Sequence, residues 1–125
     1  MNNKIISRIS ISLLAVIMIV FGVYHFMKPE NLVSYIPSFL PGGVFWVYAV
    51  GAAFILAGIA FIINKKVKLA AYLLALLVFL FVIMIHIPNY LNGSNDADRQ
   101  LSFVMILKDT AIAAFALHVA ANAEN

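Results

Sequence analysis

Four long apolar stretches, separated by short polar segments, dominate the pattern of residues along the chain. They cover about residues 5–26, 44–63, 69–87 and 101–121. A helix needs roughly 20 apolar residues to cross the hydrocarbon core of a bilayer, and each stretch is close to that length. The pattern therefore predicts an all-α integral membrane protein, in which four spans of the 125-residue chain form a single four-helix bundle.

The three connecting segments differ in character. The first, MKPENLVSYIPSFLPGG, is rich in proline, the second, NKKVK, is a tight turn, and the third, PNYLNGSNDADRQ, is polar. In the first connection, an early proline and a glutamate in the first turn favour a helix start, and apolar residues follow. We expect residues 29–36 to form a short interfacial helix between spans one and two that covers the mouth of the bundle.

Composition supports lipid as the solvent of this chain. Hydrophobic residues make up 65% of it and charged residues only 10%, whereas soluble domains carry about 25% charged residues. The chain has no cysteine, which excludes disulfides and thiolate chemistry. No basic patch interleaves with aromatic residues, so nucleic acid is not an expected partner. The expected partner is the lipid bilayer.

The distribution of lysine and arginine predicts the orientation of the spans. One side is flanked by Lys4, Arg8, Lys65, Lys66 and Lys68, and the other by Lys28 and Arg99. Because cytoplasmic loops carry the excess of positive charge, both termini and the NKKVK turn are expected in the cytoplasm. No small-x-small cleavage site follows the first apolar run, so we expect it to remain as a span. The predicted location is the cell membrane, taken as the bacterial inner membrane.

Strongly polar residues are scarce in the spans, and most of them share a depth near the outer face. We select these as a candidate ligand-binding site: His25, Glu30, Trp46, His86, Asn89, Lys108 and Asp109. A charge at the centre of a span costs about 2.5–3.5 kcal/mol. At least one of Lys108 and Asp109 is therefore expected to turn inward and hydrogen-bond with His25, His86 or Asn89. A thinner cytoplasmic layer would hold Arg8 and His118.

Other interpretations of the outer layer stay open. Lys108 would snorkel toward water while Asp109 is a buried structural partner, or the layer would relay protons. Histidines 25 and 86 are too few to predict a metal or haem site, since no HxxxH pair accompanies them. The serines lie in ordinary loops, and no glycine-rich phosphate loop is present. We therefore expect no catalytic residue and no metal ligand.

Four segments of the chain carry a family resemblance: FGVYHFMKPE, IPSFLPGGVFWVYAVG, AGIAFIINKKVKLAAYLLALLVFLFVIMIHIPN and LKDTAIAAFAL. Through them nearly the whole chain, from Arg8 to about Leu117, resembles the DoxX-like family of small four-span membrane proteins. Many members of that family carry a glutamate in span two, in a G-x-x-E pattern. Phe54 takes that place in GAAFILAG, so no role of the glutamate can be carried over.

The family takes its name from a subunit of a thiosulfate:quinone oxidoreductase. The resemblance implies a membrane location and a link to quinone-dependent redox chemistry, with quinone as the one cofactor to consider. We expect a non-enzymatic membrane subunit or a protein that binds a small molecule such as quinone. The alternative is a membrane component of a quinone-linked oxidoreductase, with a redox partner subunit or a second copy as partner. A small transporter is disfavoured because no broken helix connects the two polar layers.

Overall fold

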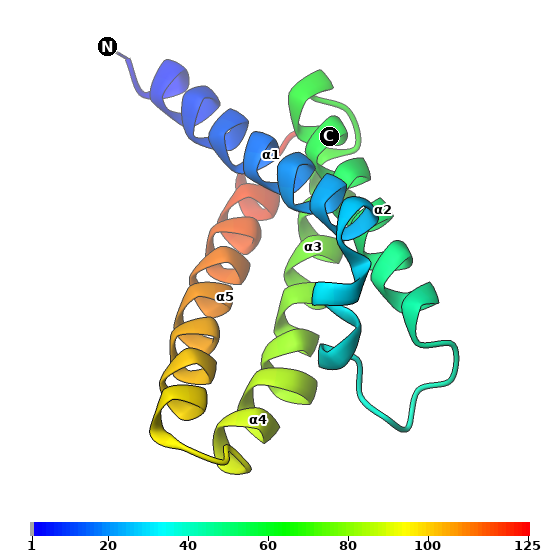
Figure 1. Cartoon of the computed structure of the whole chain (residues 1–125). Helices are drawn as coiled ribbons and strands as arrows, with labels where there is room; N and C mark the ends of the chain where they lie inside the picture. The colour runs from blue at the N-terminus through cyan, green and yellow to red at the C-terminus, as the bar shows by residue number, and fades with distance from the viewer. Residues whose placement is uncertain (1) are drawn as a thin grey trace.

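The computed structural model describes residues 2–125, which are helical and contain no strand (Figure 1). The helices are α1 (Asn3–Met27), α2 (Val44–Ile63), α3 (Val67–Phe81), α4 (Ile87–Leu91) and α5 (Asp96–Asn122). A π-helical turn, η3 (Val82–His86), joins α3 to α4, so that Val67–Leu91 forms one rod. Four helices are thus long and apolar enough to cross a membrane, as the pattern of residues predicted.

The ends of the long helices follow local sequence signals. Side-chain oxygens of Asn2 and Asn95 accept hydrogen bonds from backbone N–H groups in the first turns of α1 and α5, which is the usual role of asparagine at an N-cap. Asn64 ends α2 in the left-handed conformation, which asparagine tolerates better than most residues. The observed bounds of α2 equal the predicted ones, whereas α1 and α5 each extend beyond the predicted span.

The third predicted span ends at about Ile87, whereas the helix continues to Leu91. Pro88 has no N–H to donate and would normally disturb the preceding helical turn. Here the preceding turn is widened, and the Ile87 N–H donates to the Val82 carbonyl, five residues back. The wider π turn accommodates the proline, so the helix continues beyond Pro88.

The predicted short helix over residues 29–36 is replaced by two 3₁₀ turns, η1 (Pro29–Asn31) and η2 (Val33–Tyr35). Their hydrogen bonds, such as Leu32 N–H to the Pro29 carbonyl, span three residues. A segment this short between prolines gains little from α-helical bonds, and 3₁₀ turns are common in short connectors. Leu32 and Tyr35 of this segment line the space between the helices, as expected of a segment that covers the mouth of the bundle.

The long helices pack as two pairs, α1 with α2 and α3 with α5, and the pairs are joined mainly through α2 and α3. We call the end that carries both termini and the α2–α3 turn the terminal end, and the opposite end, which carries the α4–α5 connection, the loop end (Figure 1). Helices α1 and α5 make little contact with each other. The predicted four-helix bundle is therefore less closely packed between α1 and α5 than within the two pairs.

Close packing between the two helix pairs is concentrated toward the terminal end, whereas α1 and α2 also approach closely at Gly22 and Gly51. The core at the terminal end includes alanines from four helices, at positions 15, 57, 71, 113, 116 and 120. A Cβ atom on Gly58 would lie 2.7 Å from the Ala15 carbonyl oxygen, so only glycine lets α1 and α2 approach this closely. The Arg8 side chain donates hydrogen bonds to the carbonyls of Phe61 and Ile62. These bonds satisfy acceptors that the end of α2 leaves free.

Candidate functional site

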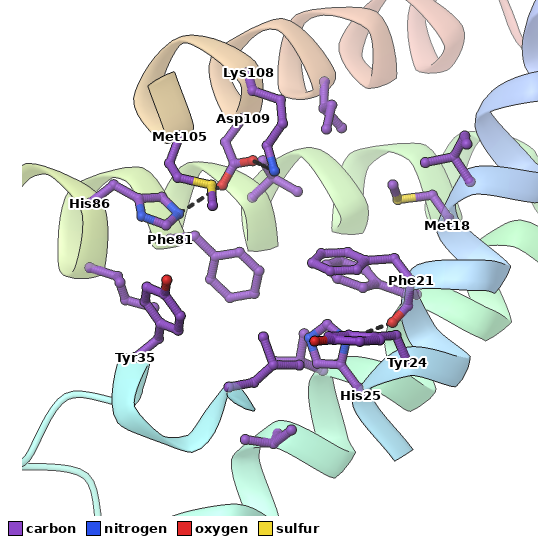
Figure 2. A pocket seen from close by; sticks show the side chains of 18 of the residues that line it. Met18, Phe21, Tyr24, His25, Tyr35, Phe81, His86, Met105, Lys108 and Asp109 are labelled. Carbon is purple, nitrogen blue, oxygen red and sulfur yellow. Dashed lines mark hydrogen bonds and ion pairs between the residues drawn. The ribbon is translucent and has the colours of Figure 1, made fainter. Parts of the chain in front are cut away.

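A cavity of about 530 Å³ lies between the two helix pairs, toward the loop end (Figure 2). One wall comes from α1 and α2, the opposite wall from α3, η3 and α5, and residues of the first connection lie across it. Most of its lining is apolar, including Met18, Val50, Phe54, Phe81 and Ile112. Ligand pockets usually measure about 300–1,000 Å³ and are mainly apolar with a few placed polar groups. This cavity has the size and character of such a pocket.

Three charged or polar side chains form a cluster on the wall of α3, η3 and α5. The His86 Nε2 atom lies 3.0 Å from Asp109 Oδ2, and Lys108 Nζ lies 3.6 Å from Asp109 Oδ1. His86 is 8% exposed and Asp109 is 7% exposed. The predicted hydrogen bond between Asp109 and a histidine of span three is therefore confirmed. We call His86, Asp109 and Lys108 the ionic cluster.

Lys108 lies at the edge of the cavity and not deep inside it. Its side chain is 47% exposed, and its Nζ atom lies 5.8 Å from the centre of the Phe21 ring on α1. A cation over an aromatic face is attracted by the ring quadrupole. Lys108 thus reaches from α5 across the opening toward α1, with donors left over after its contact with Asp109.

The π turn brings His86 to the cavity. Val78, Val82 and His86 are all buried and are spaced by four residues. In an α-helix each four-residue step drifts by about 40° around the axis. A wider turn reduces that drift, so His86 stays on the buried face shared with the two valines. Its ring then meets Asp109 on α5 at hydrogen-bonding distance.

His25 faces the same cavity from α1, on the opposite wall (Figure 2). The residue is 6% exposed, and its ring packs edge-on against Phe21 at 4.7 Å and Phe54 at 5.4 Å between centres. Its Nδ1 atom lies 2.7 Å from the Phe21 carbonyl oxygen. Because a carbonyl oxygen only accepts hydrogen bonds, Nδ1 must carry a proton.

Three of the seven predicted site residues lie away from the cavity lining. Glu30 in η1 and Asn89 in α4 are exposed. The Trp46 indole N–H donates to the Pro41 carbonyl at 2.6 Å and so anchors the first connection. The structure brings together His86, Lys108 and Asp109, places His25 across the cavity from them, and leaves these three outside.

Sequence reasoning overlooked two tyrosines of the site. Tyr35 in η2 lines the cavity, and its ring centre lies 6.5 Å from that of His86. Tyr24 also lines it, and its hydroxyl accepts a hydrogen bond from the Asn31 side chain at 2.9 Å. The signal for Tyr24 was its place beside His25, and for Tyr35 its place in a segment expected to cover the mouth.

The expected second polar layer near the terminal end does not form. Arg8 is engaged with the carbonyls at the end of α2. His118 is exposed on α5, where the Asn122 side chain donates to its backbone carbonyl. These two residues serve separate helix ends, so the ionic cluster and His25 make up the polar part of the candidate site.

The arrangement suits binding of a molecule with two unlike parts. The apolar walls would hold a hydrocarbon or aromatic body, and the ionic cluster together with His25 would hold a polar head. Among residues 2–125, no three His, Asp or Glu side chains gather closely enough to hold a metal ion. Phe21, Phe54 and Phe81 contribute aromatic rings to the lining of this space.

Comparison with known proteins gives a family but no described relative. No curated protein and no solved structure matches the chain. Residues 14–120 match the family described as "Domain of unknown function (DUF8561)". This match covers all four long helices except the first turns of α1 and the last residues of α5. The chain therefore belongs to the DUF8561 family.

Proposed function

We propose that the protein is a four-span membrane protein that binds one amphipathic small molecule in the cavity between its helix pairs. The observation that carries this proposal is the burial of His86 and Asp109 against a cavity of about 530 Å³ with a mainly apolar lining. Buried charges are costly and rarely kept inside a membrane without a use. The head of the ligand would contact the cluster, and its apolar body would lie along α1, α2 and α5.

The membrane setting rests on the outer surface of the helices. Large apolar side chains are exposed on every long helix, for example Leu13, Leu56, Leu76 and Leu107. A soluble protein would not leave apolar surface of this extent in water. The terminal end carries five of the lysines and arginines, which supports a cytoplasmic position for both termini. Reporter fusions at Asn125 and at Asn95 should then give opposite sides of the membrane.

The opening between α1 and α5 supports entry from the bilayer. These two helices make little contact, and Lys108 lies at the edge of the cavity between them. A molecule dissolved in the membrane would enter sideways without leaving the hydrocarbon phase. Lys108 would meet its head at the opening, because a lysine keeps its charged end near the polar boundary while its stem contacts apolar surface.

A membrane component of a quinone-linked oxidoreductase is the second candidate. The observation that favours it is the set of aromatic rings around His25, with Phe21 and Phe54 stacked at 5.6 Å between centres. A quinone ring would pack against these faces, and Lys108 would donate to a quinone carbonyl. Electron transfer would then require a redox partner subunit. A thiosulfate:quinone pairing follows from the DoxX-like resemblance alone.

The test is the recovery of a bound molecule from protein purified in mild detergent, followed by solvent extraction and mass spectrometry. Ile112 lines the cavity on α5, whereas the adjacent Ala111 is exposed and lies outside the lining. Ile112→Trp fills the cavity and should abolish the co-purifying molecule, and Ala111→Trp is the matched control that should retain it. Equal recovery from both variants would refute binding in this cavity. A quinone in the extract would favour the second candidate.

A further inference from the structure

We infer that the ligand head carries a hydroxyl group, which donates a hydrogen bond to His25 Nε2. This inference deepens the proposed function and rests on it. It names the chemical class of the ligand as an apolar molecule with a hydroxylated head, such as a phenol or an alcohol. A head that offers only acceptors, such as an ether or a ketone, would leave His25 without a donor.

The first step concerns the free nitrogen of His25. Its Nδ1 proton is given to the Phe21 carbonyl, and no ion pair among residues 2–125 involves His25. In the neutral imidazole the other nitrogen, Nε2, is then a hydrogen-bond acceptor. The hydrogen bonds of the described residues include none to Nε2. His25 therefore presents a lone pair that the protein itself does not use.

The second step concerns where that lone pair points. In residues 2–125, no side-chain nitrogen or oxygen is both shut off from open space and without a hydrogen-bond partner. Since Nε2 has no partner, it must reach open space, and the open space beside the ring is the cavity. His25 is nonetheless 6% exposed and held between two phenyl rings. An acceptor fixed this firmly in an apolar pocket selects for a donor, because leaving it unpaired costs free energy.

The third step concerns the donor that faces the same space. The Phe21 ring is contacted by His25 on its own helix and by Lys108 Nζ from α5. Both residues line the cavity, and Figure 2 draws the Phe21 ring between them. A hydroxyl satisfies His25 because its hydrogen donates to Nε2, and Lys108 offers its donors to acceptors of the ligand nearer the opening. An ammonium donor in place of the hydroxyl would face the Lys108 charge, which disfavours it.

His86 does not supply the same selectivity. Its Nε2 atom is tied to Asp109, which also contacts Lys108. The hydrogen bonding of His86 is therefore set by its partners in the ionic cluster. His25 touches no carboxylate and keeps one role. The preference for a hydroxyl is thus assigned to His25.

The test compares two probes that differ only in this hydrogen, para-decylphenol and its methyl ether, para-decylanisole. Binding to the full chain in lipid nanodiscs is measured by calorimetry, with empty nanodiscs subtracted. Both probes offer an oxygen to Lys108, so a difference between them reports on the donor. The wild type should bind the phenol about fivefold to tenfold more tightly, the usual worth of one buried hydrogen bond.

Variants assign that difference to His25. His25→Phe should bind both probes equally and keep its affinity for the ether within about twofold. Val23→Ala, on the exposed face of α1, is the control and should keep the full preference. Equal affinity of the wild type for both probes overturns this inference alone. A preference that persists in His25→Phe also overturns it. Failure of the wild type to bind either probe overturns the proposed function as well.

A measurement on the wild-type protein tests the inference without relying on a variant that could fail to fold. Nitrogen NMR of the His25 side chain reports directly on Nε2. Its resonance should move toward that of a hydrogen-bonded acceptor when the phenol is added, and should stay in place with the ether. An Nε2 resonance that responds to neither probe, or to both alike, contradicts the inference.

Discussion

At the terminal end the helices meet almost backbone to backbone, whereas at the loop end the two pairs part around a cavity. At the terminal end, Gly58 and the alanines bring the helices into direct contact and leave no space between them. Aromatic rings and the ionic cluster border the second region. Lipid offers no hydrophobic drive for helices to associate, so small residues and close packing must hold one end. The helix pairs can then remain separated at the loop end while the protein stays folded.

The comparison separates what stabilises the chain from what equips it to bind. The terminal end uses Arg8 to satisfy carbonyls of α2, which is a structural task. The loop end keeps charged and hydrogen-bonding groups on opposite walls of an apolar space. Substitutions at the terminal end should therefore affect stability alone, and those at the loop end should affect ligand retention, with stability changing only where a charge is stranded.

The largest expected effect is that of Asp109→Ala at the loop end. Removing this carboxylate strands His86 and leaves Lys108 without its counter-charge. Breaking a buried pair costs about 3–5 kcal/mol, and we expect the low end because the Lys108 side chain is 47% exposed. Unfolding by SDS in mixed micelles should report this loss, together with loss of the bound molecule. Unchanged stability would mean that the cluster is not buried in the protein as it exists in lipid.

Gly58→Val should give the next largest loss, at the terminal end. A Cβ there meets the Ala15 carbonyl at 2.7 Å, and backbone cannot move aside as a flexible side chain can. Overpacking of this kind costs about 1–3 kcal/mol. Ala53→Val on the exposed side of α2 is the control and should change stability by less than about 0.5 kcal/mol. Provided that the variant still folds, its affinity for the ligand should be unchanged.

A double-mutant cycle sharpens the account of the loop end. His86→Ala and Asp109→Ala should together lower the unfolding free energy by less than the sum of the two single losses, because each single change strands the other member of the pair. The expected coupling is about 1–2 kcal/mol, within the usual range for residues in direct contact. Ile106→Leu serves as a nearby apolar control. Full additivity would show that the 3.0 Å contact between His86 and Asp109 carries no energy.

Lys108→Met should have the smallest effect on stability and a clear effect on binding. Its side chain is half exposed and contacts Asp109 at 3.6 Å, so the pair resembles a surface ion pair worth about 0.2–1 kcal/mol. The methionine keeps the apolar stem and removes the donor. We expect the affinity for para-decylphenol and for para-decylanisole to fall by a similar factor. A loss confined to the phenol would contradict the role given to Lys108.

The sequence predicted the depth of the polar residues along the helices better than the direction in which their side chains face. Depth and scarcity sufficed to predict that Lys108 or Asp109 bonds with His25, His86 or Asn89, because lipid offers these groups no partner, and the structure shows the pair to be Asp109 and His86. Depth also selected Asn89, one turn beyond His86, yet it is exposed in the structure. The π turn at Val82–His86 lies just before it and changes the rotation of every later residue. Hydrophobic pattern carries no signal for such a turn, so the direction of Asn89 could not be derived.

The absence of a local sequence signal also explains the other differences between the predicted and the observed structure. Pro88 suggested a helix end because a proline removes one bond, but whether a wider turn absorbs that loss depends on the packing of α5. The opening between α1 and α5 also has no local signal, since each helix alone is apolar on most of its surface. By contrast, α2 is bounded by Gly43 and Asn64, and its two ends were predicted correctly.

The central claim is that an amphipathic molecule lies inside the cavity with its head at His25 and Lys108. The most direct measurement is NMR of methyl-labelled protein in lipid nanodiscs with bound para-decylphenol. Nuclear Overhauser contacts should connect the probe with methyl groups that line the cavity, those of Val50, Ile85 and Ile112. Contacts confined to outward methyl groups outside the lining, such as those of Val23, Val104 and Leu107, would place the probe in the surrounding lipid and contradict the account.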